Sequence, residues 1–139
     1  MFRHEEGDDM NASVAMKQYQ SVGVHSGVMD ASPHRLIQML MEGVLQRIAQ
    51  AKGNVKRKEI SDKAVNITKA INIVAGLRSS LDVEQGGEIA ANLDSLYDYM
   101  LHRLMLANAR SDEEILDEVS TLMISIKLSW DSIADQVAQ

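Results

Sequence analysis

The chain has 139 residues, the length of one domain with a single hydrophobic core. Its net charge of −6 argues against a nucleic-acid binder and against docking on an anionic membrane, because both need a basic face. The absence of cysteine excludes disulfides, thiolate catalysis and zinc–cysteine sites. One proline and few aromatic residues favour helices, and no apolar run is long enough for membrane insertion.

The N-terminal part of the chain has only a weak pattern. Residues 1–9 are charged and aperiodic, so we expect a disordered lead without the apolar stretch of a signal peptide. Residues 10–31 begin with sparse apolar positions, Val14, Tyr19 and Val22, which glycine and serine residues then interrupt. This pattern predicts a short helix followed by a loop.

The first strongly periodic segment begins at Ser32. Ser32 is a good N-cap, and Pro33 suits the first helical position because the N–H that it lacks would be unbonded there. Apolar residues at helical spacing continue to Ile48, and Gly53-Asn54 is a C-terminal signal. We therefore expect a helix from Pro33 to about residue 53.

Three further segments place apolar residues every three or four positions. They cover about residues 59–81, 88–108 and 111–137. Ser111 and Glu114 form a capping box at the start of the last segment. The sequence thus predicts an all-α fold, an antiparallel four-helix bundle over 32–139 with the short N-terminal helical segment packed on it.

The apolar faces of these helices are wider than one bundle core requires. Tyr97 belongs to the core face, whereas Tyr99 lies about 200° away around the same helix. Two interpretations stay open for the extra residues. They are edge positions that residues 10–22 partly cover, or they form an apolar groove for a partner helix.

Catalytic and cofactor motifs are absent from the sequence, so we expect neither enzyme activity nor a cofactor. There is no nucleotide-binding loop, no nucleophile elbow and no Glu-x-x-His pair of a di-iron bundle. Asp94, Asp98 and His102 share one helix face and could touch a metal, but their offset from the apolar face favours a solvated stripe. Gly86-Gly87 before a helix start resembles part of a phosphate-binding loop, but the nearby acidic residues Asp82, Glu84 and Glu88 would repel an anion. We therefore interpret the glycine pair as a tight turn.

Four stretches of the sequence, in order, carry a family resemblance. They are Ser32-Pro33-x-x-Leu36-Ile37-x-Met39-Leu40 with Gly43; Ser79-Ser80-Leu81-Asp82 before Gly86-Gly87-Glu88-Ile89-Ala90; Asn92-Leu93-x-x-Leu96-Tyr97-Asp98-Tyr99-Met100 with Arg103-Leu104 and Ala107-Asn108; and Trp130. Together with Tyr19, they resemble the flagellar secretion chaperone FliS family over about residues 10–135. Met41 stands where the family usually has a tyrosine.

The resemblance implies a cytoplasmic, non-enzymatic export chaperone. Such proteins bind the disordered C-terminal segment of flagellin, prevent premature polymerisation and assist delivery to the flagellar type III export apparatus. Other flagellar export proteins are further candidate partners. The family's N-terminal segment can cover part of the binding surface, so Tyr19 is expected in that cover. From their apolar excess, the expected groove walls are Leu36, Ile37, Leu40, Ile71, Leu93, Tyr99 and Leu106.

Two alternative hypotheses belong to other functional classes. One is a self-associating structural bundle whose extra apolar faces bury each other in a homodimer. The other is a metal-dependent enzyme built on Asp94, Asp98 and His102. A fixed oligomer that flagellin peptide leaves unchanged would support the first, and unchanged melting on metal addition and chelation would count against the second.

Overall fold

The protein is described from a computed structural model that covers residues 31–137, with side chains to residue 133. The predicted lead and almost all of the predicted N-terminal segment, including Tyr19, lie outside this range. Four helices make up the described part: α2 (Pro33–Lys56), α3 (Ile60–Ser79), α4 (Val83–Arg110) and α5 (Glu113–Val137). The all-α four-helix prediction is confirmed.

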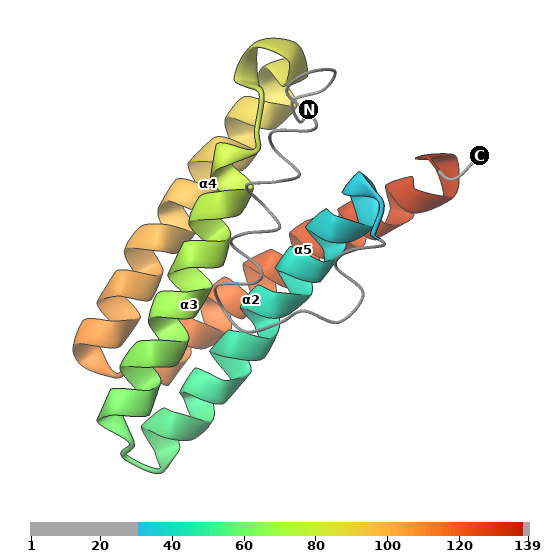
Figure 1. Cartoon of the computed structure of the whole chain (residues 1–139). Helices are drawn as coiled ribbons and strands as arrows, with labels where there is room; N and C mark the ends of the chain where they lie inside the picture. Colours follow the sequence, from blue (N-terminus) through green and yellow to red (C-terminus); the bar gives the residue numbers. More distant parts are fainter. Residues whose placement is uncertain (1–30, 138–139) are drawn as a thin grey trace.

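Successive helices run antiparallel and close a ring in which α2 packs against α3 and α5, and α4 packs against the same two helices (Figure 1). Short turns join the helices, as expected from the short loops in the sequence. In Figure 1, α4 and α5 lie close where α4 ends and α5 begins, and they diverge towards the start of α4.

All four helices contribute to one continuous core. Its fully buried large side chains are Tyr97, Leu40, Met41, Ile48, Ile67, Ile73, Leu77, Met100, Leu104, Leu116 and Met123. Each of the leucine, isoleucine and methionine side chains among them contributes about 1.5–3 kcal/mol through removal from water. The expected core position of Tyr97 is confirmed, and burial raises the pKa of its hydroxyl.

The predicted start of the first helix is confirmed, but its predicted end was wrong. The Ser32 hydroxyl accepts the backbone N–H of Arg35 over 3.1 Å, as an N-cap does. Helix α2 continues through Gly53 to Lys56, and the chain turns at Lys58, whose φ of 59° is left-handed. The turn signal is thus a lysine, and Gly53 is an ordinary helical residue.

The predicted turn at Gly86-Gly87 is confirmed, whereas the predicted cap at the start of α5 was wrong. Gly87 has φ 57° and ψ −136°, so it breaks α4 after the first turn, as the tight-turn interpretation requires. Ser111 does not cap α5, because its left-handed φ of 51° ends α4 instead. Asp112 is the cap: its Oδ1 accepts the backbone N–H groups of Glu114 over 2.9 Å and Ile115 over 3.3 Å.

Candidate functional site

An apolar groove lies between the first half of α4 and the second half of α5. It has a volume of about 470 Å³. Its lining residues are Met41, Ile89, Asn92, Leu93, Leu96, Ser125, Ile126, Ser129, Trp130 and Ile133. Most of these side chains are apolar, and Ile89 is 64% exposed, which is unusual for a residue of this type. The groove can therefore bind an apolar partner but holds no charged group for chemistry.

Trp130 forms a wall of this groove and is fixed by the start of α2. Its ring stacks on the imidazole of His34, with centroids 4.4 Å apart and planes 9° from parallel. Its indole Nε1–H also donates to the His34 carbonyl over 3.0 Å. Burial lowers the pKa of His34, so its ring is kept neutral against the indole. The groove therefore has a rigid aromatic wall.

A polar cluster ties α4 to α5 one turn beyond Leu96. The Tyr99 hydroxyl donates to Oε2 of Glu118 over 2.6 Å, and Arg103 Nε donates to Oε1 over 2.7 Å. These two hydrogen bonds, that of Tyr99 first, lower the pKa of the Glu118 carboxyl. The ionised carboxylate is thus paired from both sides, and none of the three residues lines the apolar groove.

The structure brings only part of the predicted groove wall to this site. Leu93 lines the groove, whereas Tyr99 is 44% exposed in the polar cluster and does not line it. Leu36, Ile37 and Leu40 are buried in the core and do not line it. Their apolar side chains at helical spacing pack inside the bundle.

The remaining predicted residues lie elsewhere. Ile71 and Leu106 are partly buried and pack against the core. Tyr19 lies outside the described residues, so its covering role stays a prediction. Sequence reasoning missed most of the groove, because Leu96 and Ile133 follow the same apolar spacing as core residues. For Trp130 the family resemblance was the available signal.

The metal hypothesis has no support in the described residues. Arg78 of α3 donates through Nε to Asp94 over 2.8 Å and through Nη1 to Asp98 over 2.9 Å. This hydrogen bonding lowers the pKa of Asp94 and raises that of Arg78. Within residues 31–133 no group of three or more His, Asp or Glu side chains is placed to hold a metal ion.

Comparison with known proteins gives the family of the chain. The family described as flagellar protein FliS matches residues 15–137. The chain belongs to the FliS family.

Several named members of the FliS family are similar over nearly their whole length. The flagellar secretion chaperone FliSB of Pseudomonas aeruginosa is 54% identical over 125 residues, which cover 90% of this chain and 99% of that protein. The flagellar secretion chaperone FliS of Salmonella typhimurium is 41% identical over 130 residues, which cover 93% of this chain and 96% of that protein. The flagellar secretion chaperone FliS of Vibrio cholerae is 40% identical over 119 residues, which cover 86% of this chain and 88% of that protein.

Membership in the FliS family confirms the resemblance found in the sequence. The family is one of flagellar secretion chaperones, so the chain is a chaperone of flagellar export. Among the helices described, none is long and apolar enough to span a bilayer.

Proposed function

We propose that the protein is an export chaperone that binds the C-terminal segment of flagellin in the α4–α5 groove. Binding there covers the apolar face of the client, prevents premature polymerisation, and assists delivery to the flagellar type III export apparatus from the cytoplasm. The observation that carries the proposal is an open apolar groove, with a fixed tryptophan wall, in a member of a secretion-chaperone family.

The dimensions of the groove suit one short amphipathic helix. Its α4 wall runs from Ile89 to Leu96, which spans about 10 Å or two helical turns. Two turns of a client helix present apolar side chains at positions i, i+3 or i+4, and i+7 to such a groove. Ordering a disordered client costs part of the contact energy, which keeps the complex reversible enough for release.

Two isoleucines provide a matched test by calorimetric titration with a peptide of the flagellin C-terminal segment. Ile89 lines the groove and is 64% exposed, whereas Ile60 starts α3 and is 70% exposed away from it. Because a carboxylate facing an apolar client is desolvated, Ile89→Asp is expected to weaken binding about tenfold or more. Ile60→Asp is expected to bind as the wild type does.

Circular dichroism and calorimetry of the wild-type titration give independent readouts. A client that folds in the groove gains helicity and binds with a negative heat-capacity change. Equal binding by Ile89→Asp and Ile60→Asp would place the client elsewhere. Absence of any binding by the folded wild-type protein would contradict the proposed function itself.

A further inference from the structure

The tryptophan wall of the α4–α5 groove is held by a histidine that does not itself line the groove. The ring of His34 stacks on that of Trp130 with centroids 4.4 Å apart, and the His34 carbonyl oxygen accepts the indole Nε1–H over 3.0 Å. Trp130 lines the groove, whereas His34 does not. Because both contacts come from the second residue of α2, the position of the wall depends on this one residue.

The surroundings of the His34 ring suit a neutral imidazole. Its Nε2 atom is buried, and no described residue forms a hydrogen bond with it. Protonation makes both ring nitrogens donors, so it would leave a buried N–H without an acceptor. The first turn of α2 contains no acidic residue, and a positive charge at a helix N-terminus is unfavourable.

The charged group that acts on His34 from α5 is Asp131, and its carboxylate already has two partners. Oδ1 of Asp131 accepts from Gln38, and Oδ2 accepts from Lys127, both over 2.7 Å. Burial of the ring lowers the pKa of His34, and the charge of Asp131 opposes this shift only in part. The carboxylate therefore does not hold the imidazole in its charged form.

The other charged side chains near the start of α2 pair with one another. Arg35 lies 3.1 Å from Glu42, which also lies 3.6 Å from Lys127. The second helix packed against α2 is α3, and among the described residues it contributes no charge that shifts the pKa of His34. The ring is thus neutral at neutral pH and takes up a proton under mildly acidic conditions.

We propose that His34 is a positioning residue that makes client binding pH-dependent: its neutral ring holds Trp130 in the groove wall, and its protonation releases the stack and weakens the client. This inference rests on the proposed function of the groove. The client-bound protein keeps the imidazole neutral, so at acidic pH it binds fewer protons than the free protein. The affinity therefore falls as the pH falls through the lowered pKa, and it is constant above this range.

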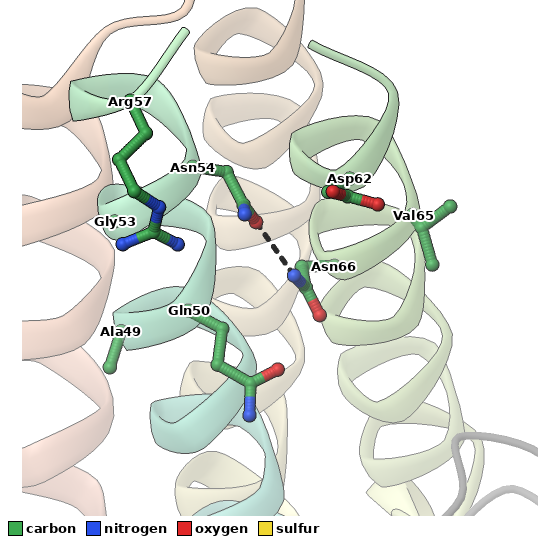
Figure 2. A pocket seen from close by; sticks show the side chains of 8 residues that line it. All are labelled: Ala49, Gln50, Gly53, Asn54, Arg57, Asp62, Val65 and Asn66. Carbon is green, nitrogen blue, oxygen red and sulfur yellow. Dashed lines mark hydrogen bonds between the residues drawn. The ribbon is translucent and has the colours of Figure 1, made fainter. Parts of the chain in front are cut away.

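A second hollow, between α2 and α3, provides an internal reference for this effect. Figure 2 shows that its lining includes Asn54 and Asn66, joined by a hydrogen bond of 2.7 Å, and no histidine lines it. Asn54 also donates to Glu59 over 2.9 Å, and this bond lowers the pKa of the Glu59 carboxyl below its ordinary value of 4.5. The two amides therefore keep their partners while His34 titrates.

The first test needs no client and follows the single tryptophan by ¹H–¹⁵N NMR of the full chain. The indole signal of Trp130 is expected to shift with the same midpoint as the His34 ring, below 6.5, while the side-chain amides of Asn54 and Asn66 stay in place. An indole signal that ignores pH would overturn the proposal. A midpoint above 6.5 would also overturn it, because it would show that the imidazolium is favoured against the indole.

The second test measures the affinity for a peptide of the flagellin C-terminal segment by calorimetry at two pH values. From about pH 7.5 to about pH 5.5, the wild-type affinity is expected to fall about three- to tenfold, since one group gives at most about tenfold per pH unit. His34→Phe keeps a ring against Trp130 and takes up no proton, so the ratio of its two affinities should be close to one. His102→Gln removes an exposed histidine that does not line the groove, and it should keep the wild-type ratio.

The ratios separate this inference from the proposed function. Equal ratios in the wild type and His34→Phe would overturn the role of His34, although client binding at neutral pH would still support the groove. Absence of binding by the wild type at neutral pH would contradict the proposed function itself. Circular dichroism checks the fold of each variant at both pH values, and His34→Tyr, which also takes up no proton in this range, gives the same comparison where His34→Phe is unfolded.

Discussion

The ammonium group of Lys63 lies 2.7 Å from the hydroxyl of Ser111 and fixes the turn between α4 and α5. Lys63 is only 5% exposed, and its Nζ also donates to the carbonyl oxygen of Asn108 over 2.8 Å. A cation at this position interacts favourably with the negative end of the α4 dipole. It also explains how a serine adopts the left-handed φ of 51° that usually belongs to glycine.

Replacing Lys63 by methionine is expected to destabilise the protein by about 2 kcal/mol, because the Asn108 carbonyl and the Ser111 hydroxyl lose their buried donor. The midpoint of urea unfolding measures the change. Lys69→Met, on the same helix and without a described ion pair, should change stability by less than about 0.5 kcal/mol. Equal midpoints for the two variants would show that Lys63 does not hold the turn.

Gly87 gives a test of backbone strain without side-chain crowding. Its φ of 57° and ψ of −136° suit glycine, yet a Cβ there would meet nothing within 4 Å. Gly87→Ala is therefore expected to cost about 1–3 kcal/mol through backbone conformation alone. Thermal unfolding should show a lower melting temperature for Gly87→Ala and no loss for Gly86→Ala, since Gly86 has no positive φ.

Replacing Lys58 by glycine is expected to increase the stability of the protein. It follows α2 at the position where glycine commonly ends a helix, and it holds φ 59°. Lys58→Gly is expected to stabilise the protein by up to about 1 kcal/mol, because a left-handed conformation is costly for lysine and not for glycine. Lys56→Gly, within the helix, should lower the melting temperature; a fall for Lys58→Gly as well would contradict the argument.

His34 makes part of the stability depend on pH. Its burial lowers the pKa below the ordinary value of 6.5, and the nearby Asp131 only partly opposes this shift. Between the lowered pKa and 6.5 the unfolded chain binds more protons, so stability falls as the pH falls through this window. His34→Phe keeps a ring against Trp130 and cannot take up a proton.

The pH effect is measured by urea unfolding of both proteins at neutral and mildly acidic pH. The wild type should lose more stability on acidification than His34→Phe. An NMR titration of His34 should give a midpoint below 6.5. Parallel losses in both proteins, or a midpoint above 6.5, would rule out burial as the controlling effect.

Helices and core could be predicted because their causes are local. Apolar spacing located all four helices, and the Ser32 cap and the Gly87 turn were recognised from residue type. Gly53 does not end α2, because it lies inside the helix beside the Arg57 side chain. The start of α5 depends on a tertiary contact, because Lys63 from another helix holds Ser111 in its left-handed conformation.

The groove was harder to predict for a related reason. Core residues such as Leu40 and groove residues such as Leu96 obey the same helical spacing, and only the divergence of α4 from α5 separates them. The sequence has more apolar residues than the core takes up, and several of them are exposed. Their spacing alone does not show which of them line the groove. Of the predicted wall residues, Leu93 lies in the groove.

The most direct test of the central claim is a ¹H–¹⁵N NMR titration of the full chain with the flagellin C-terminal segment. The single tryptophan gives one indole signal, and Trp130 lies in the groove wall. Binding in the groove predicts that this signal and the amides of Leu93, Leu96 and Ile126 shift most. A client that binds while these signals stay unchanged, or that leaves the whole spectrum unchanged, would contradict it.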